Sequence, residues 1–215
     1  MKLGVVTFPG TCDDADARLA VAKVAEPVAL WHGDADLHGV DGVVIPGGFS
    51  YGDYLRAGSI ARFSPVMESV IAFAQAGGPV LGICNGFQIL CEAGLLPGAL
   101  LPNKDLRFVC RQVDLVVQTT GTPFTSTCAV GDVLSIPAKH QNGCFYGDVP
   151  ASQVVLRYAD GHNFNGSQDD VAGVVNEQGN VMGLMPHPEH AVDVLTGGSA
   201  DGLKLFEGMT RVAVA

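Results

Sequence analysis

The 215-residue sequence is short of charge, and above all of basic residues. Charged side chains make up 16% of it, against about 25% in typical globular proteins. Twelve Lys and Arg face 22 Asp and Glu, and the resulting net charge of −10 repels phosphate backbones and anionic lipid. We therefore expect neither nucleic acid nor a membrane surface as a partner. The 47% share of hydrophobic residues argues against disorder and predicts a folded core.

The sequence also lacks a continuous membrane span and a secretion signal. Its longest uncharged stretch, residues 69–91, is interrupted by Gly, Pro, Asn and Gln. It therefore predicts a helix, a buried strand and a second helix joined by turns, rather than a span. The first residues, MKLGVV, begin a strand at once instead of a charged region followed by an apolar one. These features predict a cytoplasmic protein.

Paired cysteines, nucleotide-binding loops and metal-ligand clusters are missing as well. The six cysteines show no CxxC pair and no disulfide-scaffold spacing, so most are expected to be reduced and buried. No GxxxxGK[ST] or GxGxxG loop occurs, so nothing suggests that this chain binds ATP by those routes. His187 and His190 could form half a metal site, but Pro188 disrupts a helical HxxH pair, and we expect no metal.

Short apolar strands alternate with helical segments in the first half of the chain. We predict strands at residues 2–8, 27–31, 42–45 and 79–83, and helices at 13–24, from Ser64-Pro65 to about Ala76, and from Asn85 to about Ala93. Ser64 has the form of an N-cap, with Pro65 at the first helical position. This alternation predicts a parallel sheet.

The second half changes to longer strands and hairpins. They are predicted at residues 106–117, 133–138, 154–158, 171–176 and 181–185, before a closing helix over 201–212. No repeat or long polar linker divides the chain, so we expect one domain, residues 1–215. The predicted fold is α/β: a doubly wound, mostly parallel sheet with flanking helices and extra antiparallel strands in the second half.

Residues 82–86, GICNG, form the clearest chemical motif. An apolar strand precedes them and a helix beginning at Asn85 follows, so Cys84 occupies the sharp turn of a nucleophile elbow. Gly82 and Gly86 leave room where the flanking chain crowds this turn. The helix N-terminus is expected to favour the thiolate form of Cys84, which attacks carbonyl carbons. A merely buried core cysteine is the plainer alternative, which the glycine frame disfavours.

Residues 185–189, MPHPE, supply a base and a group that orients it. A thiolate that performs acyl chemistry needs both. Pro188 disfavours helical dihedrals at His187, and alternate side chains of an extended segment point the same way. We therefore expect the His187 imidazole to meet the Glu189 carboxylate. A proline-rich surface turn is the alternative.

A place for a developing oxyanion follows the strand at residues 42–45. That strand runs into Pro46-Gly47-Gly48, a turn whose bare backbone N–H groups can face a ligand. The N–H groups of Gly48 and Asn85 would form the pair of donors. Such turns are common in any fold, so this motif has weight only beside the other two.

The order Cys84, His187, Glu189, closed by HPE, resembles the class I glutamine amidotransferases. The runs FPGTCDDADA, IPGGFSYGDYLRAGSIAR, LGICNGFQIL, NKDLRFVCR, NFNGS, VAGVVNEQGNVMGLMPHPE and SADGLKLF are similar to the separate-chain glutaminase subunits that serve purine synthesis. The resemblance covers nearly the whole chain. It implies glutamine hydrolysis, with Cys84 as nucleophile, His187 as base and Glu189 as its orienter. It also implies that Gln88 and the loop Asn165-Gly166-Ser167 hold the glutamine substrate.

The resemblance further implies that the ammonia passes to a synthetase subunit, joined by a small accessory subunit. On that synthetase partner, ATP and magnesium are then expected, with no cofactor on this chain. The sequence departs from the family pattern at residues 10–13, which are one residue short, at 140–146 and at His190.

Two other classes remain as alternatives. A cysteine hydrolase or stress-type protein of similar elbow geometry would normally place histidine directly after the cysteine, where Asn85 stands. A thiol sensor would need only Cys84 and would leave His187 and Glu189 unexplained.

Overall fold

The computed structural model describes residues 1–211. Its principal strands are β1 (Lys2–Thr7), β2 (Glu26–Trp31), β3 (Gly42–Ile45), β4 (Val80–Ile83), β6 (Val109–Val117), β7 (Val133–His140), β9 (Val154–Tyr158), β10 (Val171–Val175) and β11 (Val181–Leu184). The helices are α1 (Asp14–Ala22), α2 (Pro65–Gln75), α3 (Asn85–Glu92), α4 (Val194–Gly197) and α5 (Leu203–Arg211). Two short strands, β5 (Ala99–Leu101) and β8 (Cys144–Tyr146), form a separate small sheet.

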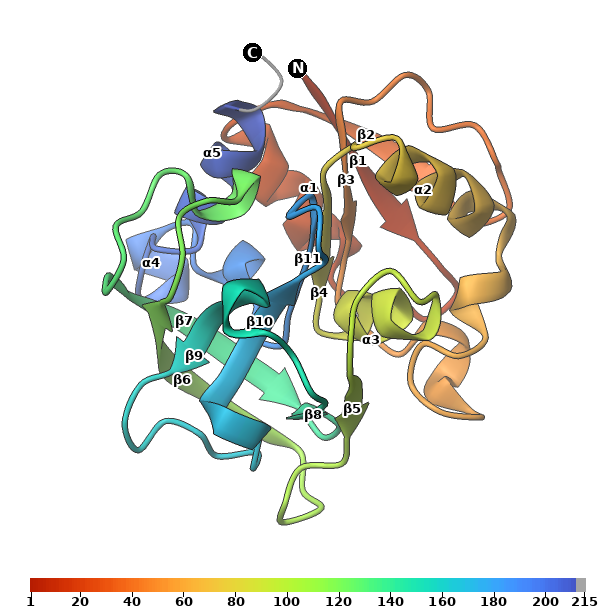
Figure 1. The fold of residues 1–215 in the computed structure, drawn as a ribbon. Coiled ribbons are helices and arrows are strands. Elements are labelled where there is room, and N and C mark those ends of the chain that lie inside the picture. The colour runs from red at the N-terminus through yellow and green to blue at the C-terminus, as the bar shows by residue number, and fades with distance from the viewer. Residues whose placement is uncertain (212–215) are drawn as a thin grey trace.

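The principal strands form one sheet in the order β2-β1-β3-β4-β11-β10-β9-β6-β7, with helices on both faces (Figure 1). The strands from β2 to β11 in this order are parallel. All residues of β3 and β4 are buried, which suits interior strands covered on both faces. From β1 the chain steps one way to β2 and later the other way through β3 to β4. Right-handed crossovers therefore put α1 and α2 on opposite faces.

The remaining strands are antiparallel. A tight turn joins β10 to β11 as a hairpin, and β9, β6 and β7 extend the sheet beyond it. The predicted α/β class, with antiparallel strands in the second half, is confirmed. The small β5–β8 sheet was not predicted, because two three-residue segments carry no periodicity in the sequence.

The sequence pattern predicts where α2 begins and where the closing helix ends. Ser64 does occupy the position before α2, but its hydroxyl forms no hydrogen bond with the helix and instead lies 2.8 Å from the Tyr51 Oη. Ser64 is therefore the N-cap of α2 by position, with Pro65 in the first turn as predicted, and it makes no side-chain capping bond. The predicted end of the closing helix, Val212, lies outside the described residues.

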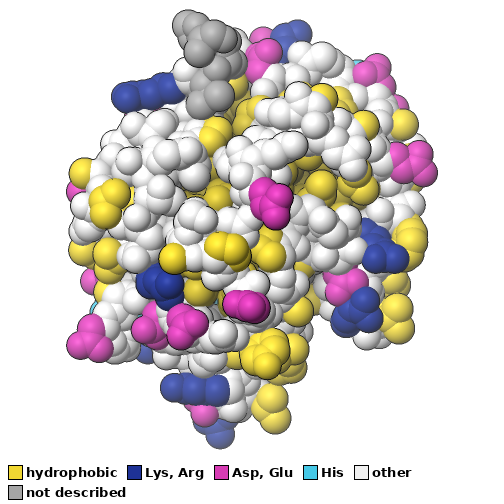
Figure 2. All heavy atoms as spheres, in the orientation of Figure 1, with side chains coloured by type: hydrophobic (Ala, Val, Ile, Leu, Met, Phe, Trp, Pro, Cys, Tyr) yellow, Lys and Arg dark blue, Asp and Glu magenta, His cyan; other side chains and the backbone are white. Residues whose placement is uncertain are grey.

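The surface agrees with the charge balance of the sequence. On the face shown in Figure 2, Lys and Arg side chains lie singly or in small groups among acidic and uncharged ones and form no continuous basic area. Within residues 1–211, no helix has the length and apolar character needed to cross a membrane.

The parallel strands β1, β3, β4 and β11 end at the same edge of the sheet, because parallel neighbours share a direction. The segments that leave this edge carry Asp13, the Pro46–Gly48 turn, Cys84 and His187. Open α/β sheets bind their ligands at this edge. The fold thus brings together groups that are far apart in the sequence.

Candidate active site

Cys84 occupies a strained turn between β4 and α3. Its backbone has φ +51° and ψ −104°, a conformation that residues other than glycine rarely adopt. Its N–H donates to the Leu184 carbonyl oxygen at 2.8 Å and so extends the ladder between β4 and β11. This is the geometry of a nucleophile elbow, in which the turn holds the side chain clear of the backbone.

The glycines on either side of Cys84 allow this turn to pack. A Cβ atom on Gly82 would lie 2.8 Å from the carbonyl group of Gly86, and one on Gly86 would overlap the carbonyl oxygen of Ile45 in β3. Real Cβ atoms do not approach other atoms so closely. Only glycine at both positions lets α3 lie against β3 and β4 as it does.

His187 follows β11, and its N–H donates to the Pro137 carbonyl oxygen of β7 at 2.7 Å. Its Nδ1 lies 2.6 Å from the Glu189 Oε1, and both side chains are buried. The two side chains meet as predicted, but the predicted extended path between them is wrong. Residues Pro188–His190 form a short 3-10 turn, and this turn brings Glu189 back onto the imidazole.

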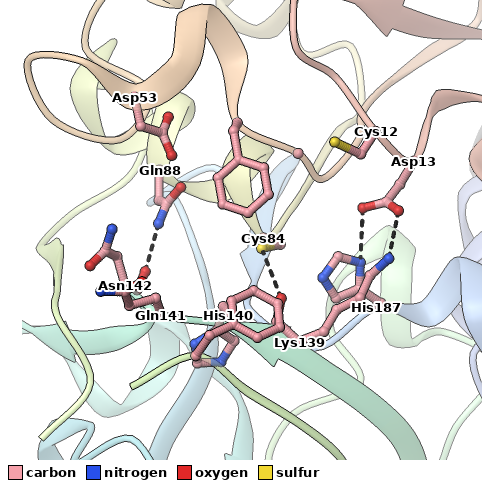
Figure 3. A pocket seen from close by; sticks show the side chains of 13 residues that line it. Cys12, Asp13, Asp53, Cys84, Gln88, Lys139, His140, Gln141, Asn142 and His187 are labelled. Carbon is pink, nitrogen blue, oxygen red and sulfur yellow. Dashed lines mark hydrogen bonds and ion pairs between the residues drawn. The ribbon is translucent and has the colours of Figure 1, made fainter. Parts of the chain in front are cut away.

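Because Nδ1 of His187 faces Glu189, Nε2 is the nitrogen available for acid-base chemistry. Nε2 is buried and has no hydrogen-bond partner within residues 1–211. His187 and Cys84 line the same cavity (Figure 3). The Cys84 thiol donates to the Lys139 carbonyl oxygen, at a long 4.0 Å. The structure therefore holds a base with an open position beside a thiol that has only a weak partner.

The cavity has a volume of about 320 Å³. That is near the lower end of the roughly 300–1,000 Å³ typical of small-molecule sites, so it suits a small ligand. Its lining consists of Cys12, Asp13, Gly48, Phe49, Asp53, Cys84, Gln88, Phe108, Lys139, His140, Gln141, Asn142 and His187.

The two predicted oxyanion donors lie on segments that are tied together. The Asn85 Oδ1 accepts from the Ser50 N–H at 3.0 Å, which joins the elbow to the turn after β3. The Gly47 carbonyl oxygen accepts from the N–H groups of Cys12 and Asp13, each at 3.2 Å. A trans peptide directs its N–H away from its C=O, so these two bonds also fix the direction of the Gly48 N–H. Gly48 itself has φ +148° and lines the cavity.

Gln88, one turn into α3, is buried and lines the cavity. Its Nε2 donates to the Asn142 carbonyl oxygen at 2.6 Å, and its Oε1 accepts from the Asn85 Nδ2 at 2.9 Å. This amide therefore holds the elbow and the loop after β7 on opposite sides of the cavity. The position suits the predicted contact with substrate.

The loop Asn165-Gly166-Ser167 does not line the cavity. The Asn165 Nδ2 donates to the carbonyl oxygen of Gly143, and the Ser167 Oγ accepts from the Phe145 N–H at 3.0 Å. These contacts place the loop behind the segment that follows β7, where it supports the cavity wall. The shape of the cavity therefore gives no support to a direct contact between this loop and glutamine.

Burial sets the protonation of the two reacting groups. It raises the pKa of the Cys84 thiol, and the charges of Glu189 and Asp13 raise it further, while the Asn85 N–H and Lys139 act in the opposite sense. Burial also lowers the pKa of His187 to about 3, against the influence of Asp13. Both shifts favour the uncharged forms of the pair, a thiol and a neutral imidazole.

The N–H of Asn85 at the start of α3 lowers the pKa of Cys84, in the predicted sense, but burial outweighs it. The macrodipole of a helix contributes roughly 0.3–1 kcal/mol, whereas full burial can shift a pKa by several units. The thiol must lose its proton during the reaction, and the neutral His187 beside it is able to accept that proton.

Asp13 and Lys139 are site residues that sequence reasoning did not identify. Asp13 lies in the loop between β1 and α1, with its Oδ2 3.6 Å from the His187 Nδ1 and its Oδ1 2.6 Å from the Lys139 Nζ. The one available signal was the position of Asp13 after a strand of the parallel sheet, because such segments converge at one edge. Lys139, on a strand whose side chains alternate between buried and half-buried, gave no comparable signal.

Four side chains in this region are close enough to share a metal ion, although no such cluster was evident in the sequence. Ligand atoms of Asp13, His187, Glu189 and His190 lie within 4.8 Å of one another. The same groups are engaged with each other, with Lys139 and with Asp16, which His190 contacts at 3.1 Å. An ion would have to displace the Lys139 ammonium group and break the bond between His187 and Glu189.

Comparison with known proteins points to one family. The model of the CobB/CobQ-like glutamine amidotransferase domain matches residues 2–202. The chain is 58% identical to phosphoribosylformylglycinamidine synthase subunit PurQ of Corynebacterium glutamicum over 213 residues, which covers 95% of each chain. It is 55% identical to the protein of the same name from Corynebacterium jeikeium, over all of this chain and 99% of the relative.

Solved structures agree with these matches. The structure of PurLQS from Thermotoga maritima contains a chain with TM-score 0.92 and 42% identity, and the match covers 98% of both chains. A glutamine amidotransferase from Thermotoga maritima gives a TM-score of 0.60 at 17% identity, over all of this chain and 96% of the other, which shows a shared fold alone.

Proposed function

The chain belongs to the CobB/CobQ-like glutamine amidotransferase family, and from that premise we propose that Cys84, His187 and Glu189 hydrolyse the side-chain amide of glutamine. The chain works as the glutamine-hydrolysing subunit of phosphoribosylformylglycinamidine synthase in purine synthesis, in agreement with its relatives. One observation carries the assignment of residues. A strained cysteine between β4 and α3 shares a cavity with a buried histidine whose Nε2 is open and whose Nδ1 is held by a carboxylate.

The reaction begins when the Cys84 thiol gives its proton to the Nε2 of His187. The sulfur attacks the amide carbon of glutamine, and the Gly48 and Asn85 N–H groups stabilise the oxyanion that forms. Loss of one such donor typically raises the barrier by about 2.7–4 kcal/mol. Glu189 holds the imidazole in orientation and stabilises its cation.

Collapse of this intermediate breaks the carbon–nitrogen bond. His187 gives its proton to the departing nitrogen, so ammonia leaves and a γ-glutamyl thioester remains on Cys84. His187 then takes a proton from water, whose oxygen attacks the thioester and releases glutamate. The thiol is restored with its proton. Gln88 is proposed to bind the substrate from the cavity wall.

The ammonia serves a partner. This chain assembles with the synthetase PurL, as in PurLQS, and PurS accompanies the two in that structure. The synthetase uses the ammonia to convert formylglycinamide ribonucleotide into formylglycinamidine ribonucleotide. We propose that ATP and magnesium act on that partner and that this chain needs no cofactor. The alternative of a stress-type cysteine hydrolase finds no support among these relatives.

We further propose that the chain acts as one domain in the cytoplasm. The continuous sheet from β2 to β7 supports the first point. All six cysteines carry free thiols, which supports a reducing compartment.

The Cys84→Ala variant tests the assignment in the complex with the synthetase. We expect glutamine-dependent synthesis to be lost, while synthesis from ammonium salts continues, because the thiol is needed only to release ammonia. Cys91→Ala is the matched control, since Cys91 lies on the same helix and outside the cavity. Substantial glutaminase activity in Cys84→Ala, or its loss in Cys91→Ala, would show that the nucleophile is misassigned.

A further inference from the structure

Asp13 is a buried carboxylate beside the base, and the reaction described above does not use it. Its side chain is 5% exposed. Its Oδ2 lies 3.6 Å from the His187 Nδ1, beyond hydrogen-bond distance, and that nitrogen already faces Glu189 at 2.6 Å. Asp13 therefore acts on the imidazole through its charge, while Glu189 holds the hydrogen bond.

The second oxygen of Asp13 is held by Lys139. The Lys139 Nζ donates to the Asp13 Oδ1 at 2.6 Å, and the lysine side chain is only 30% exposed (Figure 3). The carbonyl oxygen of the same lysine accepts from the Cys84 thiol. Lys139 thus touches the nucleophile with its backbone and the acidic partner of the base with its side chain.

The backbone of Asp13 is joined to the turn that carries Gly48. Its N–H and that of Cys12 hold the Gly47 carbonyl oxygen, and the Phe49 N–H donates to the Gly10 carbonyl oxygen at 2.9 Å. The loop between β1 and α1 is therefore fastened to the proposed oxyanion turn along several residues. Any movement of Asp13 is transmitted to that turn as well as to His187.

We propose that Asp13 and Lys139 form a charge pair that positions His187 and balances the charges on Cys84 and His187 while the proton passes between them. The inference rests on the proposed function. An imidazolium at His187 is stabilised by the Asp13 carboxylate, and a thiolate at Cys84 is stabilised by the Lys139 ammonium. The Asp13 carboxylate alone would disfavour the thiolate, and the Lys139 ammonium alone would disfavour the imidazolium. Together the two charges allow both ions to form.

Other charged and titratable groups face this couple from each neighbouring element. They are Glu189 and His190 from the 3-10 turn, His140 from β7, and Asp16 of α1 against His190. Asp13 raises the pKa of Glu189 and Lys139 lowers it, so a change at either residue also alters the charge of Glu189, which opposes the shift at Cys84 and makes it smaller.

The test measures the rate at which iodoacetamide alkylates Cys84 in the whole chain as a function of pH, followed by mass spectrometry of the Cys84 peptide. The midpoint of this pH dependence reports the ionisation of the thiol. Removing the negative charge in Asp13→Asn is expected to lower this midpoint by about one unit, and removing the positive charge in Lys139→Met to raise it by a similar amount. In the double variant Asp13→Asn/Lys139→Met the midpoint returns close to that of the unaltered chain. Asp14→Asn is the matched control and should leave it unchanged, because the Asp14 carboxylate contacts Arg18 and Thr7 instead.

Turnover supplies the second measurement. Asp13→Asn should lower the kcat of glutamate release about tenfold, the factor that one pKa unit represents, although its thiol ionises more easily. If Asp13 and Lys139 only supported the fold, their variants would lower kcat without shifting the alkylation midpoint of Cys84 in opposite directions. Unchanged midpoints, or shifts of the same sign in both single variants, would overturn the proposal.

The two readouts also separate this inference from the proposed function. The alkylation midpoint needs no turnover, so it stands even if the unaltered chain does not hydrolyse glutamine. Circular dichroism checks the fold of each variant. If the buried Asp13→Asn does not fold, the less buried Lys139→Met carries the test, and a midpoint that fails to rise there counts against the proposal.

Discussion

A single methyl group at Gly47 is expected to disable the site while leaving the fold intact. A Cβ atom built on Gly47 would lie 2.5 Å from the Asp13 Oδ2 and 2.6 Å from the His187 Cε1. Carbon atoms in contact normally stand about 3.5–4.0 Å apart, so the imidazole or the turn must retreat by roughly 1 Å. The backbone at Gly47 shows no positive φ, so the perturbation in Gly47→Ala is steric alone.

The expected cost in rate follows from that displacement. The imidazole cannot move freely, because its Nδ1 is bonded to Glu189 at 2.6 Å, and Asp13 is bonded to Lys139 at the same distance. A displacement of about 1 Å at a reacting group can lower the rate roughly 100-fold, which is about 2.7 kcal/mol of barrier. Overpacking costs about 1–3 kcal/mol of stability, which lowers Tm by several degrees for a chain of this size.

The assay is glutamate release by the complex, with synthesis from ammonium salts as an internal standard that should not change. Gly121→Ala is the matched control, because its new methyl would meet only the Thr119 Oγ1, at an ordinary 3.7 Å. We expect that control to keep both its turnover and its Tm. A folded Gly47→Ala chain with kcat within about threefold of the unaltered one would refute the reasoning.

Two further predictions concern the histidines. Glu189→Gln should lower turnover less than His187→Ala, because the carboxylate orients the base whereas the imidazole moves the protons; equal losses in variants folded by circular dichroism would contradict separate roles. Burial lowers the pKa of His140 to about 3. Between that value and about 6.5 the unfolded chain binds the extra proton, so the free energy of unfolding decreases as the pH is lowered. In urea unfolding between pH 6 and 4, His140→Gln should flatten this dependence by about 1 kcal/mol per pH unit, and equal slopes would refute it.

The sequence predicts those parts of the molecule that local pattern determines. Buried runs such as residues 80–83 predict interior strands, and the two glycines around Cys84 are required by packing that a short motif implies. His187 and Glu189 are two residues apart, so their meeting could be predicted even though the path between them is a turn rather than an extended segment.

The rest depends on contacts between distant elements. Asp13 resembles any acidic residue near a helix N-terminus, and Lys139 resembles a solvated residue of a half-buried strand, until the fold places one against the other. The raised pKa of the Cys84 thiol is likewise a product of burial, which no local motif reports. The loop at residues 165–167 has turn-forming residues in the sequence, but only the packing shows that it supports a wall rather than faces the cavity.

The place of β11 in the sheet has a consequence for how the protein is made. This late strand pairs with β4, in the interior of the sheet and beside the elbow, and carries His187 with it. While the chain is being synthesised, β4 exposes an unpaired apolar edge until β11 has emerged, which favours off-pathway association and slows folding through long-range pairing. A nascent chain in that state carries the cysteine without its base. Amidase activity can therefore arise only at the end of folding, when the last interior strand closes the sheet.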